Sequence, residues 1–206
     1  MSFRALGPAD SESPIPCVRN GPASGSCGSS GTGTTGTTRS TSSGREKLIE
    51  KTPALTALDG SGLAFEVIET ERATSAEESA EFQGIELRQL LRTIVIRRGE
   101  NDYVFVLTPG GRNIEWGKLR KHLGVSRLSL PEKEEATQAT GYERGAITPF
   151  GSTTAWPVIA DASIEREEKV AIGGGGHGVN LHIRAGDLID HLKADVVDVT
   201  KETTFS

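Results

Sequence analysis

The segment from Thr140 to Gly151 has the clearest pattern of residues suited to chemistry. Gly141, Gly145 and Gly151 alternate in it with Pro149 and with apolar side chains. Glycine lets a ligand approach the backbone closely, and proline restricts the backbone. The pattern therefore indicates a loop of fixed shape whose amide N–H groups bind a carbonyl or an oxyanion. A tight structural turn is the alternative interpretation.

Two further features could contribute to a site. The run from Ile172 to Gly178 contains five glycines, whose successive N–H groups could form an anion-binding nest. The run lacks the Lys-Ser/Thr pair and the long helix of a phosphate loop, so a flexible hairpin connection between strands at residues 170–172 and 179–183 is the alternative. Asp161 follows a predicted strand over residues 156–160, where its carboxylate could reach a pocket or cap a turn.

Other kinds of site lack the residues that they need. The sequence contains no nucleophile elbow, P-loop or dinucleotide fingerprint. Cys17 and Cys27 both precede the part expected to fold, which excludes a disulfide framework and a cysteine nucleophile from that part. The four histidines have no recognisable ligand spacing, so we expect neither a metal nor another cofactor.

Composition divides the chain into a tail and one domain. Of the 24 residues from Gly21 to Gly44, 20 are Gly, Ser or Thr, and such a segment buries too little apolar surface to fold. We predict a disordered tail over residues 1–45, a folded domain over residues 46–200 and a short C-terminal tail over residues 201–206. No stretch has the length and apolarity of a signal peptide or a membrane span, so we expect a cytoplasmic protein.

Charge is unevenly distributed along the chain. The first 45 residues contain four basic and two acidic residues, so 19 basic and 26 acidic residues remain, a formal charge of −7. A domain this acidic is not a general nucleic-acid binder. Between Gly84 and Arg127, however, nine basic residues stand against four acidic ones. This segment predicts either a basic face or merely a surface of uneven charge.

The residues singled out above must be positioned by short helices and strands. Thr52-Pro53 and the capping-box spacing Ser75–Glu78 predict two helix starts. The runs 93–98 and 103–108 are rich in β-branched and aromatic residues and predict a hairpin. Further helices are expected after Ile114, over residues 131–139 and over residues 187–193, and further strands over residues 63–68, 146–148, 156–160, 170–172, 179–183 and 196–199. This arrangement favours an α+β domain with a mixed, strongly curved, barrel-like sheet flanked by helices.

Taken in order, several of these pieces resemble the YbaK/prolyl-tRNA editing family. The most specific is Gly145–Pro149, which fits the family's Gly-x-x-x-Pro loop at the correct distance before Asp161. The similar segments, spread over nearly all of residues 46–200, are Thr52–Leu55, Leu91–Val95, Thr140–Tyr142, Gly145–Gly151, Val158–Asp161 and Gly173–Gly178.

The resemblance implies a YbaK-like fold and hydrolysis of the ester between a wrong amino acid and the 3′ end of tRNA, typically Ala or Cys on tRNA for proline. In the family's proposed chemistry the terminal ribose hydroxyl helps to activate water, and the protein supplies position and electrostatics. The implied catalytic residues are Arg92, Thr93, Gly145 and Asp161, and the implied substrate-binding residues are Ala146, Ile147, Thr148, Pro149, Phe150, Gly173 and Gly174. The implied partner is aminoacyl-tRNA, bound through its acceptor end, and neither DNA nor a membrane. Association with a synthetase and the oligomeric state stay open.

One position departs from the family's pattern. The family's functional lysine precedes a threonine at the first hairpin strand, and this chain has Arg92-Thr93 there. Arginine keeps the charge, but its high pKa makes proton transfer in catalysis implausible, and its fork differs in shape from an ammonium. Two functions are therefore open: an active deacylase, and a module of the same fold that binds without cleaving. Which of them applies depends on whether Arg92 can take the role of the family's lysine.

Overall fold

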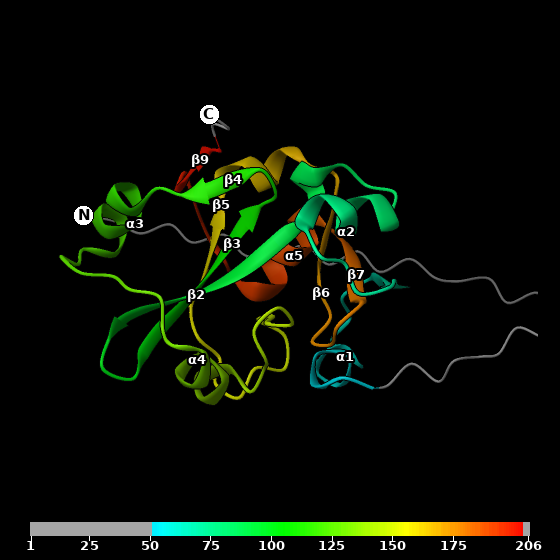
Figure 1. The fold of residues 1–206 in the computed structure, drawn as a ribbon, viewed down its shortest axis with the longest axis horizontal. Coiled ribbons are helices and arrows are strands. Elements are labelled where there is room, and N and C mark those ends of the chain that lie inside the picture. The colour runs from blue at the N-terminus through cyan, green and yellow to red at the C-terminus, as the bar shows by residue number, and fades with distance from the viewer. Residues whose placement is uncertain (1–50, 204–206) are drawn as a thin grey trace, which may run out of the picture. The chain divides into compact units, whose positions relative to one another are not determined.

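Residues 51–203 are described by the computed structural model (Figure 1), and the tail predicted over residues 1–45 lies outside them. The helices are α1 (Pro53–Leu58), α2 (Ala76–Phe82), α3 (Trp116–Leu123), α4 (Lys133–Thr140) and α5 (Ala185–Leu192), with 3-10 turns η1 (Leu87–Gln89) and η2 (Ala162–Arg166). The strands are β1 (Phe65–Glu69), β2 (Leu91–Gly99), β3 (Asp102–Pro109), β4 (Arg112–Ile114), β5 (Val158–Asp161), β6 (Lys169–Gly173), β7 (Val179–Arg184), β8 (Asp195–Val197) and β9 (Thr200–Glu202). None of these helices is long and apolar enough to cross a membrane.

The strands of residues 51–203 form three sheets. The first is antiparallel with the order β1-β7-β6, the second is mixed with the order β2-β3-β5-β8, and the third pairs β4 with β9. A single parallel bridge between Leu90 and Ala171 connects the first two sheets. Beyond this bridge β2 borders a pocket instead of another strand, and no sheet in the described residues closes on itself. The α+β class is therefore confirmed, whereas the single barrel-like sheet is not.

The predicted hairpin is confirmed as β2 and β3, which pair with Thr93 opposite Leu107. Side chains alternate between the two faces of a strand, and apolar residues cover both faces of this hairpin. Val95 contributes to the larger core with α1, β6 and β7, and Ile96 contributes to a second core with α3. Because Thr93 shares the face of Val95, Arg92 must lie on the opposite face.

The helix starts predicted from capping residues are confirmed. The Thr52 hydroxyl accepts a hydrogen bond from the Leu55 N–H at 3.2 Å, and Pro53 occupies the first turn of α1. The Ser75 hydroxyl accepts from the Glu78 N–H at 3.1 Å at the start of α2. Both caps satisfy N–H groups that have no partner inside the helix.

Two strand predictions are wrong. Residues 146–148 form no strand because they belong to a loop, in which Ala146 is buried and Ile147 is half-buried without strand pairing. The strand predicted over residues 196–199 is divided into β8, which ends at Val197, and β9, which begins at Thr200. Strand β9 extends to Glu202, and the domain bounds at residues 46 and 200 stay predictions.

Candidate active site

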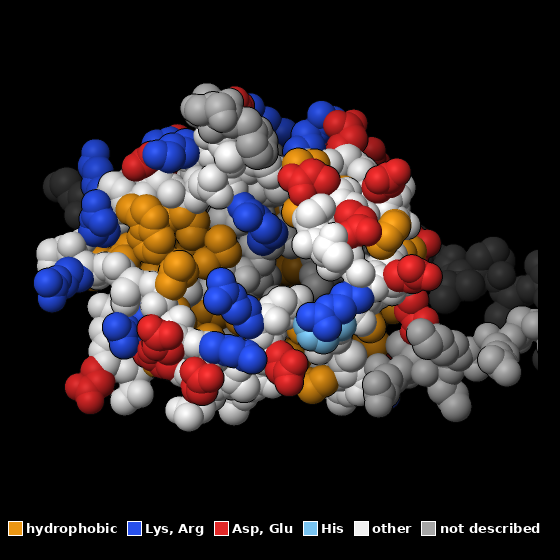
Figure 2. Space-filling model, in the orientation of Figure 1, with side chains coloured by type: hydrophobic (Ala, Val, Ile, Leu, Met, Phe, Trp, Pro, Cys, Tyr) orange, Lys and Arg blue, Asp and Glu red, His pale blue; other side chains and the backbone are white. Residues whose placement is uncertain are grey.

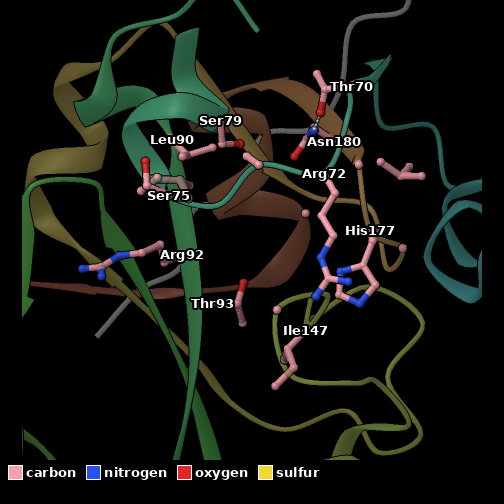
Figure 3. A pocket seen from close by; sticks show the side chains of 18 of the residues that line it. Thr70, Arg72, Ser75, Ser79, Leu90, Arg92, Thr93, Ile147, His177 and Asn180 are labelled. Atoms are coloured by element: carbon pink, nitrogen blue, oxygen red, sulfur yellow. Dashed lines mark hydrogen bonds between the residues drawn. The ribbon is translucent and has the colours of Figure 1, made fainter. Parts of the chain in front are cut away.

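A pocket of about 510 Å³ lies beside the free edge of β2 (Figure 3). Its walls come from β2, from the segment between β1 and α2, from the loop after α4 and from the β6–β7 connection. The lining residues are Thr70 to Ala76, Ser79, Leu90 to Ile94, Arg144, Gly145, Ile147, Gly173 and Gly176 to Asn180. The pocket therefore brings together five predicted site residues, which are Arg92, Thr93, Gly145, Ile147 and Gly173.

The free edge of β2 presents polar backbone groups to this pocket. Both the N–H and the C=O of Arg97 bond to Ser129, at 2.8 and 3.2 Å, and so point away from β3. Backbone groups along an antiparallel strand alternate in direction, so those of Thr93 point the same way as those of Arg97. Among residues 51–203, the buried Thr93 Oγ1 has no hydrogen-bond partner. Thr93 thus has an N–H and a C=O directed to the free edge of β2 and a hydroxyl without a partner in this part of the chain.

Arg92 lines the pocket from the other face of the strand. Its Nη2 donates to the backbone carbonyl of Arg112 in β4, while its buried Nε has no hydrogen-bond partner within residues 51–203. Figure 3 shows its guanidinium extending away from the Thr93 side chain. The arginine is therefore anchored at the wall, with donors left unused.

The loop after α4 has the fixed shape that the sequence predicts. The Tyr142 hydroxyl donates to the Phe150 carbonyl at 2.7 Å and closes the loop on itself. Burial raises the pKa of Tyr142 to about 12, so this phenol stays a neutral donor. Of the site residues predicted in this loop, only Gly145 and Ile147 line the pocket. Ala146, Thr148 and Phe150 are buried and Pro149 is half-buried, and none of these four lines it.

The glycine-rich run connects β6 and β7, as the hairpin interpretation predicts, but the connection is closely packed and not the flexible one expected. The Thr52 hydroxyl donates to the Gly174 carbonyl at 2.6 Å. A Cβ at Gly174 would lie 2.7 Å from the Val179 side chain, and a Cβ at Gly175 would lie 2.8 Å from the Tyr142 ring. Packing therefore accounts for these two glycines. Gly173 lines the pocket and Gly174 does not.

Asp161 lies outside the pocket lining and is 1% exposed. Its Oδ2 accepts from the N–H groups of Val199 and Thr200 at 3.1 and 2.9 Å, and its Oδ1 accepts from the N–H and hydroxyl of Ser163. Burial of the carboxyl tends to raise its pKa, but these hydrogen bonds outweigh burial and lower it below the ordinary value. The structure thus uses Asp161 to fix the chain before β9.

We predict that Asp161→Asn lowers the free energy of unfolding by about 1 to 3 kcal/mol near neutral pH, because an amide leaves buried N–H donors poorly satisfied. A carboxyl whose pKa is lowered by folding stabilises the fold above its unfolded pKa, and this contribution is lost as pH falls through the folded pKa. The gap between wild type and variant should therefore shrink on acidification. Urea unfolding at several pH values measures this difference in the free energy of unfolding, and Asp198→Asn is the exposed control. Equal stabilities at neutral pH would contradict this role.

Among the pocket residues that were not predicted from the sequence are Arg72, Arg144 and His177. Arg144 lies inside the loop that the sequence singled out, and His177 lies inside the glycine-rich run, so their positions were available signals. No local pattern marks Arg72. The His177 Nε2 lies 3.8 Å from the Glu143 carboxylate, which links the loop and the glycine-rich run across the pocket.

Comparisons with known proteins agree with this geometry. A family model described as an aminoacyl-tRNA editing domain matches residues 70–191, a range that contains every lining residue of the pocket. The chain is 26% identical to a proline–tRNA ligase of Thermosipho melanesiensis over 65% of its own length and 24% of the ligase, so it spans about a quarter of that relative. It is 21% identical to a candidate Cys-tRNA(Pro)/Cys-tRNA(Cys) deacylase of Enterococcus faecalis, over 76% of this chain and 97% of the relative. A crystal structure described as a candidate trans-editing enzyme for prolyl-tRNA synthetase superposes with a TM-score of 0.67 and 25% identity, covering 72% of this chain and 95% of the other.

Proposed function

This chain belongs to the aminoacyl-tRNA editing domain family, and we propose from that premise that it is a deacylase of mischarged tRNA. The proposed substrate is tRNA for proline carrying a small amino acid such as Cys or Ala, in line with the names of its relatives. The observation that carries the proposal is the pocket at the β2 edge, where unpaired groups of Thr93 meet the family's glycine loop at Gly145.

In the proposed reaction, water attacks the ester carbonyl carbon and the bond to the ribose oxygen breaks. The amino acid leaves as a carboxylic acid, and the ribose oxygen takes up a proton. The Thr93 N–H and hydroxyl are donors suited to the carbonyl oxygen as it gains negative charge. Ile147 supplies an apolar wall for a small side chain, and larger amino acids are spared because they do not fit.

The direct test incubates the purified protein with tRNA for proline charged with alanine, cysteine or proline. We expect release of alanine or cysteine and retention of proline. The alternative function, a module that binds without cleaving, would show tRNA binding with no release of any amino acid. If the protein neither releases alanine or cysteine nor binds the charged tRNA, both functions are contradicted.

We further propose that a basic groove at the β2–β3 hairpin holds the backbone of the tRNA acceptor stem. The groove is lined by Arg97, Arg98, Gly99, Glu100, Arg127, Leu128 and Ser129. Arg97 pairs with Glu135 at 3.1 Å and Arg98 with Asp102 at 2.6 Å, so both charges are partly neutralised. Arg127 is exposed and has no carboxylate partner within residues 51–203. It is therefore the cleanest position for a test.

Arg127→Glu should weaken tRNA binding and reduce the slope of log K against log salt concentration by about 1, because one phosphate contact is lost. Filter binding at several salt concentrations measures both quantities. Arg166→Glu, an exposed arginine of η2 that lines neither the pocket nor the groove, is the matched control. Identical salt dependence in wild type and the Arg127 variant would favour the surface of uneven charge.

The remaining proposals follow from the substrate. We propose that the 3′ end of the tRNA binds in the pocket. We also propose that the protein acts in the cytoplasm, where charged tRNA is consumed. The occurrence of this domain within proline–tRNA ligases supports an association with a synthetase. Co-purification of the full chain with prolyl-tRNA synthetase would test it.

A further inference from the structure

The pocket is basic although the domain is acidic. Three arginines line it, Arg72, Arg92 and Arg144, against the single carboxylate of Glu71. Residues 46–206 nevertheless carry 19 basic and 26 acidic residues. In Figure 2, Lys and Arg side chains and a histidine border a hollow in the face toward the viewer. A local excess of positive charge on an acidic body favours an anionic group at this place over general binding of polyanions.

Two of the three arginines have unused guanidinium groups. Arg92 is anchored to the carbonyl of Arg112, whereas Arg72 and Arg144 form no hydrogen bond or ion pair within residues 51–203. Arg72 belongs to the segment between β1 and α2, and Arg144 belongs to the loop after α4. They approach the pocket from two different walls. Figure 3 shows the Arg72 guanidinium beside the His177 ring, on the side of the pocket that faces Ile147.

We propose that Arg72 and Arg144 bind the phosphate that joins the last two nucleotides of the tRNA. This inference rests on the proposed function, because the ester stands on the terminal ribose, next to that phosphate. A guanidinium donates two parallel hydrogen bonds to phosphate oxygens, and neither arginine must first break an ion pair. Held from two walls, the phosphate fixes the terminal ribose, and the ester carbonyl is directed toward Thr93.

The test compares two minimal substrates that carry the amino acid released fastest from intact tRNA. One is the aminoacyl ester of adenosine, which has no phosphate, and the other is the same ester of the dinucleotide CpA, which has one. We expect wild type to prefer the dinucleotide ester in kcat/KM. In the double variant Arg72→Ala/Arg144→Ala this preference should fall about 10-fold or more, mainly through KM, because the charge-assisted hydrogen bonds to the phosphate are lost. Arg184→Ala, an exposed arginine outside the pocket lining, should keep the preference.

The outcomes separate this inference from the proposed function. If wild type cleaves both esters and the double variant keeps the full preference for the dinucleotide, the phosphate site is wrong while the deacylase stands. If wild type cleaves neither ester nor charged tRNA, the deacylase is wrong. In that case calorimetric binding of the non-hydrolysable amide analogues of both substrates still tests the arginines. Equal affinity of wild type for the analogues with and without phosphate would overturn the site.

Discussion

Arg92→Ala should lower the single-turnover rate of deacylation roughly 30-fold to 1,000-fold, which corresponds to about 2 to 4 kcal/mol for one charge-assisted contact to the transition state. The reason is that Arg92 lines the pocket and that its buried Nε has no hydrogen-bond partner in the described part of the chain. A buried donor without a partner is unusual, and a substrate oxygen is the group that would satisfy it. Arg88→Ala, an exposed arginine of η1, is the control. Full activity of the Arg92→Ala protein would remove this residue from the site.

Arg92→Lys is the sharper comparison because it keeps the charge and introduces the residue that the family has at this position. Lysine has a more compact charge and cannot form the planar fork with which arginine donates to the Arg112 carbonyl. If arginine is adapted to this pocket, the lysine variant should be equal or slower. If arginine marks lost catalysis, the variant should release the amino acid faster while tRNA binding stays about the same. Rates and binding measured on the same preparations distinguish the two cases.

Much of the fold could be predicted because its signals are local. The Thr52 and Ser75 caps depend on residues three positions apart, and the β2–β3 hairpin depends on two adjacent runs. The contact between the first two sheets has no local signal in the sequence. It depends on one bridge between Leu90 and Ala171, which are distant in the sequence, and no periodicity in either segment indicates that pairing stops there.

The parts of the candidate site that have local sequence signals could be predicted. The parts that depend on contacts between distant segments could not. The glycine loop can be predicted from the composition of its own segment, and it contributes Gly145 to the pocket. Asp161 has the residue type and position of a site carboxylate, but its partners Val199 and Thr200 come from a segment 38 and 39 residues later. Arg72 becomes a pocket residue only because β1 pairs with β7, which brings the segment after β1 against the glycine-rich connection.

Gly145→Val should reduce the rate of deacylation by about two orders of magnitude while the protein stays folded. Gly145 has φ +97°, a conformation that valine adopts only with strain of about 1 to 3 kcal/mol. It is also exposed, and a Cβ there would lie 3.6 Å from the His177 ring, so the valine methyl groups would extend toward the pocket and not into the core. Backbone approach of the aminoacyl group should therefore be obstructed. Single-turnover deacylation and thermal unfolding of the same protein measure the two effects.

Gly62→Val separates strain from obstruction. Gly62 is likewise exposed, with φ +77°, but a Cβ there meets no atom of residues 51–203 within 4 Å, and the residue does not line the pocket. Both variants should lose a similar amount of stability, because both force valine into the left-handed region. Only the Gly145 variant should lose activity beyond what its stability explains. If the two variants deacylate tRNA at comparable rates, the loss at Gly145 is strain alone, and the backbone of this loop does not contact the substrate.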